Sequence, residues 1–156
     1  MATNSNLTTN LNLLAPNGFR LIIDKAEFAN TEFFVTSFSL PSANLGETQV
    51  NYKNAIGYVP GETLTFDSIS MRIAMDEELK GYTELLQWMV ANETKLTVKD
   101  MIISILSNTN EPNKQIQFTN AFPVSVSGVE FSTQTTDIEF LQTDITFRYD
   151  RFTIIK

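Results

Sequence analysis

The chain has 156 residues, a formal net charge of −7 and a hydrophobic content of 42%, which is typical of a single domain that buries a core. It contains no cysteine and no histidine. Disulfides, thiolate or imidazole metal sites and histidine-dependent catalytic triads are therefore excluded. An enzyme of this composition would have to work with carboxylates, lysine, tyrosine or serine.

The charge and hydropathy patterns argue against a membrane and against nucleic acid as direct partners. No apolar run approaches the roughly 20 residues of a membrane-spanning helix. Residues 1–17 lack the basic region of a signal peptide, and we interpret them as a polar N-terminal arm. Residues 61–93 hold 7 acidic and 2 basic residues, and no lysine or arginine cluster is present to follow a phosphate backbone.

The first elements are two predicted strands and a long loop. Residues 18–24 alternate apolar and polar side chains, and so do residues 31–39, which predicts an antiparallel pair. Pro41 ends the second strand, and residues 40–61 are predicted to form a long irregular loop. Ordered loops of this length are uncommon in small domains and usually serve a function or form a contact.

The middle of the chain predicts a strand followed by a helix. Residues 64–75 read as a strand whose apolar side chains change face near Asp67 and Ser68, which indicates a β-bulge. Apolar residues at helical spacing then predict a helix from Glu77 to about Ala91. Asp76 is the predicted N-cap.

The C-terminal half predicts further strands. Residues 101–106 and 115–119 form an expected hairpin, and residues 122–132 and 137–150 are expected to be bent strands because each changes parity. The expected fold is a single domain, mainly β with one flanking α-helix, arranged as a small antiparallel β-barrel or sandwich.

Four features of the sequence are candidates for chemistry. The acids at positions 76–78 suit a divalent cation, but a capped helix start is the preferred interpretation. Trp88 and Tyr82 suit a stacking platform, but the core is preferred. A carboxylate pair for glycoside hydrolysis has no supporting pocket signature.

The fourth feature is a set of polar side chains on two strands, which suit either an aqueous channel or ordinary solvent exposure. These residues are Asp67, Ser68, Ser70 and Arg72 in one strand and Asp144, Thr146 and Arg148 in the other.

Three segments in order, FFVTSFSLPSANLGETQV (33–50), VPGETLTFDSISMRIAMDEELKGYTELLQWM (59–89) and TDITFRYDRFTI (143–154), resemble the tail tube proteins of contractile-tailed bacteriophages. The shared features are an aromatic strand ending in Ser-Leu-Pro-Ser, a Gly-Glu-x-Leu-Thr-Phe-Asp strand, an acidic helix start and a final strand rich in Phe and Tyr. Baseplate tube initiators and type VI secretion tube proteins share this domain.

The resemblance implies a structural virion protein that is not an enzyme and has no cofactor. Its homohexameric rings would stack into a hollow conduit for DNA delivery, inside a sheath and on a baseplate tube initiator. The tape measure protein and DNA would pass through the lumen without specific binding, and the acidic charge would keep DNA from adhering. The tail would be assembled in the host cytoplasm. The seven polar strand residues become candidates for the lumen wall.

The long loop carries six apolar residues that a free loop would expose, so we predict that they dock on a neighbouring subunit. They are Leu45, Val50, Tyr52, Ile56, Tyr58 and Val59. Two alternatives remain: a tube initiator, cap or terminator at the baseplate or neck, and a monomeric β-sandwich carbohydrate-binding module.

Overall fold

The computed structural model describes residues 18–23, 35–107, 109–134 and 140–155. In chain order the elements are β1 (Phe19–Ile22), β2 (Val35–Ser39), β3 (Ala43–Tyr52), β4 (Ala55–Phe66), β5 (Ile69–Ala74), α2 (Lys80–Thr94), β6 (Lys99–Leu106), β7 (Pro112–Val126), β8 (Gln142–Arg148) and β9 (Arg151–Ile154). The predicted arm 1–17 and the start of the predicted second strand lie outside the described residues.

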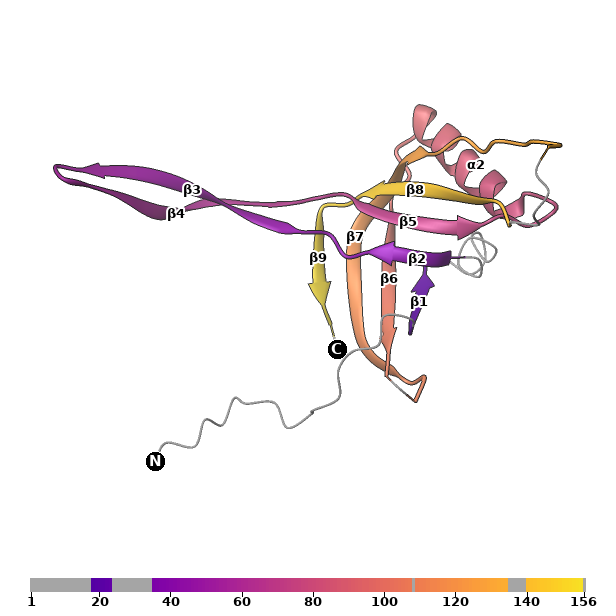
Figure 1. Cartoon of the computed structure of the whole chain (residues 1–156), viewed down its shortest axis with the longest axis horizontal. Helices are drawn as coiled ribbons and strands as arrows, with labels where there is room; N and C mark the ends of the chain where they lie inside the picture. The colour runs from indigo at the N-terminus through magenta and orange to yellow at the C-terminus, as the bar shows by residue number, and fades with distance from the viewer. Residues whose placement is uncertain (1–17, 24–34, 108, 135–139, 156) are drawn as a thin grey trace.

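The body of the molecule consists of two antiparallel layers that share the long strand β7 (Figure 1). The N-terminal part of β7 lies between β6 and β9, and β1 follows β6 at the edge. Its C-terminal part, Phe122–Val126, pairs with β8, which is followed by β5 and β2. The mainly β class is therefore confirmed.

Among the described residues the sheet does not close into a barrel, because its strand order begins at β1 and ends at β2. The two edge strands still approach one another, since the rings of Phe19 and Phe38 lie 4.9 Å apart, edge to face. The body is an open, strongly bent sheet.

Alternation along the strands builds the core. In β5, Ile69, Met71 and Ile73 are buried and the residues between them are more exposed, and β8 repeats the pattern. Helix α2 covers this apolar side, with Leu85 and Trp88 buried. The Trp88 ring lies 6.0 Å from that of Phe147, and its Nε1–H donates a hydrogen bond to the Thr97 carbonyl at 2.8 Å. The core interpretation of Trp88 is confirmed.

The helix begins three residues later than predicted. Leu79 has φ = 54°, in the left-handed region, so the residues before it form a turn and not the first helical turn. The prediction of Asp76 as the N-cap is wrong, because Leu79 occupies that position and no side chain caps it. Asp76 lies one turn earlier, where its Oδ1 accepts a hydrogen bond from the Lys80 N–H at 2.9 Å. Glu78 forms an ion pair with Lys80.

The predicted parity changes fall mostly at breaks between elements. Near Asp67 the prediction of a bulge is wrong, because β4 ends at Phe66 and β5 begins at Ile69. The two strands predicted between 115 and 132 are one strand, β7, which includes Asn120 at φ = 53° and ends at Val126. The β6–β7 hairpin is confirmed by its register.

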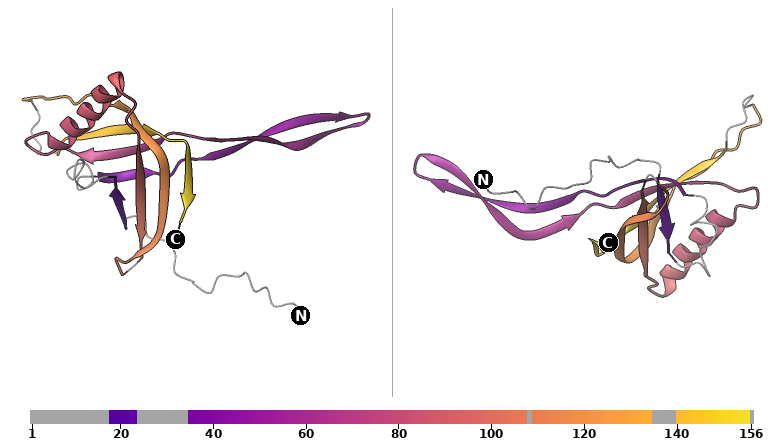
Figure 2. Two further views of the ribbon diagram at one scale, coloured as in Figure 1. Left: turned by 180° about the vertical axis from the view of Figure 1, so that it is seen from behind. Right: turned by 90° about the horizontal axis from the view of Figure 1, so that it is seen from below.

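The prediction of an irregular loop at 40–61 is wrong. Strands β3 and β4 form a long antiparallel hairpin that projects from the body (Figures 1 and 2). Thr48, Val50, Ile56 and Tyr58 are β-branched or aromatic residues that favour strands, and residues 53–54 make a two-residue connection. The half-buried alternation typical of sheet strands is missing, because neither strand lies on the body core.

Candidate assembly interface

The projecting hairpin carries a set of large exposed apolar side chains. Of the six residues predicted to dock on a neighbour, all but the half-buried Val50 are exposed: Leu45, Tyr52, Ile56, Tyr58 and Val59. Ile56 is 62% exposed and Tyr58 is 65% exposed. Leu64 on β4 is also exposed and was not among the predicted contact residues, because sequence reasoning placed it in a core strand.

The register distributes these residues over both faces of the hairpin. Residues directly opposite in an antiparallel pair share a face, and successive pairs alternate. Tyr52 pairs with Ala55, Val50 with Gly57 and Thr48 with Val59, so Tyr52, Val50 and Val59 form what we term the Tyr52 face. The intervening pairs put Ile56 and Tyr58 on the opposite, Tyr58 face, beside Asn51 and Gln49.

Gly61 lets the two hairpin strands approach one another closely. The register shifts between Leu45 and Glu47. A Cβ atom on Gly61 would lie 2.7 Å from the carbonyl oxygen of Gly46, a backbone atom that cannot swing away. Glycine is therefore required at position 61 for the two strands to approach this closely.

Hydrogen bonds and aromatic contacts tie the root of the hairpin to the body. The Asp67 N–H donates to the Ser42 carbonyl at 3.1 Å, and the Ser42 hydroxyl donates to the Asp67 carboxylate. The Tyr149 hydroxyl donates to the Asp67 carbonyl at 2.7 Å. The Phe66 ring lies 5.1 Å from the Phe152 ring.

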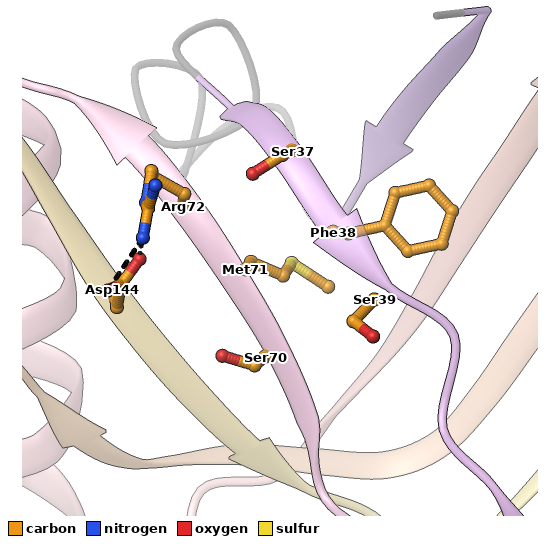
Figure 3. A pocket seen from close by; sticks show the side chains of 7 residues that line it. All are labelled: Ser37, Phe38, Ser39, Ser70, Met71, Arg72 and Asp144. Atoms are coloured by element: carbon orange, nitrogen blue, oxygen red, sulfur yellow. Dashed lines mark hydrogen bonds and ion pairs between the residues drawn. The ribbon is translucent and has the colours of Figure 1, made fainter. Parts of the chain in front are cut away.

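The body also presents an exposed polar face, which we term the serine face, over β2, β5 and β8 (Figure 3). The register places Ser70 opposite Thr146 and Ser39, and Arg72 opposite Asp144 and Ser37. A shallow hollow of about 270 Å³ on this face is lined by the three serines, Arg72 and Asp144, together with Phe38 and Met71 (Figure 3).

Arg72 and Asp144 form a bidentate ion pair across the serine face. Arg72 donates to Asp144 from Nε at 2.7 Å and from Nη2 at 3.2 Å. The hydrogen bond from the guanidinium lowers the pKa of the Asp144 carboxyl, and the same bond raises the pKa of Arg72. Both side chains are about half exposed, so the pair orders this surface more than it stabilises the fold.

Four of the seven residues predicted for the lumen lie together on the serine face: Ser70, Arg72, Asp144 and Thr146. Arg148 follows on the same side of β8. Asp67 and Ser68 lie instead in the β4–β5 connection, and the Asp67 carboxylate is engaged at the hairpin root. Sequence reasoning missed Ser37 and Ser39, whose alternation with apolar residues in 31–39 was the available signal.

The match to known proteins then identifies the chain's family. Residues 23–153 match the family model described as "T4-like virus tail tube protein gp19". The chain belongs to this family. No curated protein sequence matches it significantly.

Solved structures show that the tail tube fold extends over nearly the whole chain. A chain of the anti-feeding prophage cap (AFP tube terminating cap) superposes with a TM-score of 0.76 at 20% identity, covering 99% of both chains. A chain of the sheath–tube complex of an extracellular contractile injection system, PVC, gives 0.67 at 21% identity, covering 92% of this chain and 91% of that one. Hcp1 from Flavobacterium johnsoniae gives 0.52 at 16% identity, covering 87% and 93%.

The part of the chain that the structure describes contains neither a cluster of metal-ligating side chains nor a membrane-spanning helix. Within the described residues, no three side chains of metal-ligating type gather into a possible ion site. No helix in that part of the chain is long and apolar enough to cross a membrane. The serine face carries two arginines, Arg72 and Arg148, and one aspartate, Asp144, so its charge is close to balanced. Three of the seven acids of residues 61–93, at positions 76–78, lie instead just before α2.

Proposed function

We propose that this tail tube protein is a non-enzymatic structural subunit whose homohexameric rings stack into the hollow tube of a contractile phage tail, a conduit for DNA delivery. The observation that carries the proposal is the hairpin. Its large apolar side chains are exposed on both faces, an arrangement that is only marginally stable in water and gains stability when other chains cover it.

The topology of the β2-β5-β8-β7 layer supports ring formation. All its pairs are antiparallel, so β2 and the C-terminal part of β7, at its two edges, run in opposite directions. Rotation about a ring axis brings β2 of one copy beside β7 of the next without reversing either strand. An even number of strands per copy therefore allows a continuous antiparallel sheet around the ring, with every such edge paired.

In such a ring the serine face would line the lumen. It is polar and nearly neutral in charge, which suits a wall past which the tape measure protein and DNA slide without binding. Helix α2 covers the opposite, apolar side of β8 through Trp88 and would face the sheath. A baseplate tube initiator would set where the tube begins in the phage, while the purified chain would still associate into rings at high concentration. Assembly would take place in the host cytoplasm.

The two faces of the hairpin would contact different copies of the chain. One partner can cover only one face of a two-stranded ribbon. The Tyr52 face and the Tyr58 face both expose apolar side chains, so each requires a partner of its own. We assign both to tube contacts, within a ring and between rings. A tube initiator, cap or terminator would use the same surfaces and differ in copy number.

The test is to shorten the hairpin without disturbing its root. Leu45 and Leu64 lie opposite one another, so residues 46–63 are replaced by an Asn-Gly turn that joins them. We expect a folded monomer with an unchanged melting temperature that forms neither rings nor tubes in electron micrographs. An unfolded product would show that the hairpin supports its own body and would overturn the assignment.

A further inference from the structure

We infer that Ser42, Asp67 and Tyr149 form a root clamp that sets the direction of the β3–β4 hairpin before assembly. The three residues come from the β2–β3, β4–β5 and β8–β9 connections and meet through hydrogen bonds at Asp67. The clamp's effect on assembly rests on the proposed function, whereas its effect on hairpin direction does not.

The direction of the hairpin must be fixed at its root, because a small rotation there produces a large displacement of the tip. Among the described strands, β3 and β4 pair with one another alone, so their direction is set where the chain leaves and re-enters the body. Strand β4 has 12 residues and is therefore about 40 Å long at roughly 3.3 Å per residue. A rotation of about 10° at the root moves the tip by about 7 Å, more than the width of a side-chain contact.

The clamp constrains this rotation because it ties together three separate segments. The bond from the Asp67 N–H to the Ser42 carbonyl joins the outgoing and returning chains. The Ser42 hydroxyl holds the Asp67 carboxylate across the same gap. The Tyr149 hydroxyl, at 2.7 Å from the Asp67 carbonyl, attaches this joint to the body.

Aromatic packing makes Tyr149 a firm anchor. Its ring lies 4.9 Å from the ring of Phe118, edge to face, and Phe118 is fully buried. Phe66, the last residue of the hairpin, lies near both Phe152 and Tyr149. The core packing thus fixes the position of the Tyr149 hydroxyl, and the hydrogen bond from that hydroxyl holds Asp67 in place.

The protonation state of Tyr149 agrees with this role. Burial, and secondarily the nearby Asp67 charge, raise the pKa of Tyr149. The hydroxyl keeps its proton at neutral pH and remains a hydrogen-bond donor to Asp67.

The experiment measures the direction of the hairpin in the monomer and compares it with assembly. The chain has no cysteine, so Lys53→Cys at the hairpin tip and Lys114→Cys on β7 give two unique sites for spin labels. Pulsed electron paramagnetic resonance then yields the distribution of tip-to-body distances. Tyr149→Phe removes the hydroxyl and keeps the ring, and Tyr82→Phe on α2 makes the same chemical change away from the root.

We expect Tyr149→Phe to broaden the distance distribution about twofold and Tyr82→Phe to leave it unchanged. The protein concentration needed for half-maximal assembly should rise about three- to tenfold in Tyr149→Phe, the factor that corresponds to one ordinary hydrogen bond. Ser42→Ala, a change at an exposed side chain, should act in the same direction if Tyr149→Phe fails to fold.

Unchanged distance distributions in Tyr149→Phe or in Ser42→Ala would overturn the clamp. A broadened distribution with unimpaired assembly would overturn its positioning role. If the unlabelled parent chain itself forms no assembly, the proposed function fails, while the distances still decide whether the clamp directs the hairpin.

Discussion

An isoleucine-to-alanine substitution should affect two different properties of this tail tube protein, depending on its position. Ile103 on β6 is 1% exposed and lies in the core, whereas Ile56 on the hairpin is 62% exposed. If the hairpin is an assembly arm, Ile103→Ala destabilises the monomer and Ile56→Ala destabilises only the assembly.

The expected magnitudes follow from burial. Removing a fully buried isoleucine side chain down to alanine costs about 2–5 kcal/mol, which lowers the melting temperature of a chain this size by roughly 10 °C. Ile56→Ala should change the stability of the monomer by less than about 0.5 kcal/mol. Its lost methylene groups would cost about 1–2 kcal/mol at each contact in a tube, or roughly a five- to thirtyfold higher assembly concentration.

The assay separates folding from association by concentration. Unfolding in urea is followed through the fluorescence of Trp88 at a concentration too low for assembly, and assembly is followed by sedimentation and electron microscopy of concentrated samples. If Ile56→Ala lowers monomer stability as much as Ile103→Ala does, the hairpin packs on its own body and the reasoning is refuted. Normal assembly of Ile56→Ala would equally contradict it.

Three further predictions concern single contacts. Trp88→Phe leaves the Thr97 carbonyl without its indole donor and should lower the free energy of unfolding by about 1–3 kcal/mol in urea titrations followed by circular dichroism; no change would show that the bond is dispensable. The pKa of Asp144, measured by nuclear magnetic resonance, should lie below its ordinary value of 3.8 because of Arg72, and Arg72→Ala should raise it. The small contribution of this ion pair to stability is present above pH 3.8, the ordinary pKa of Asp144, and is lost as the pH falls through the lowered pKa. The pKa of Tyr149 is raised in the folded protein. The contribution of Tyr149 to stability is therefore present below pH 10.0, its ordinary pKa, and is lost as the pH rises through the raised pKa. Between about pH 8 and 11 the melting temperature of the parent chain should fall more steeply than that of Tyr149→Phe, and identical slopes would contradict this.

Much of the body could be predicted because its side chains obey strict periods. The alternation through Ile69, Met71 and Ile73 and the helical spacing of Leu85 and Trp88 record directly which faces are buried. Helix termini were less certain, because Leu79 adopts its left-handed conformation in a turn where its N–H donates to the Asp76 carbonyl. No residue-type signal marks such a leucine in advance.

The sequence of the hairpin predicts a loop and not two strands for a physical reason. Sequence patterns report strands through a buried and an exposed face, and β3 and β4 bury neither face against the body. Their exposed residues were nevertheless identified, because Tyr52, Ile56 and Tyr58 are costly to leave in water wherever the backbone goes.

The position of Asp67 could not be predicted either. In the sequence it belongs to a polar strand with Ser70 and Arg72, and only the fold brings Ser42 and Tyr149 to it from 25 and 82 residues away. Contacts of that kind depend on how three connections meet, which no local pattern encodes.

The most direct test of the account compares electron micrographs of the full-length protein and the hairpin-shortened protein at rising concentration. The account predicts rings or hollow tubes for the full-length chain, and well-folded monomers throughout for the shortened chain. Rings or tubes formed equally by the shortened chain, or a full-length chain that stays monomeric at every concentration, would contradict it.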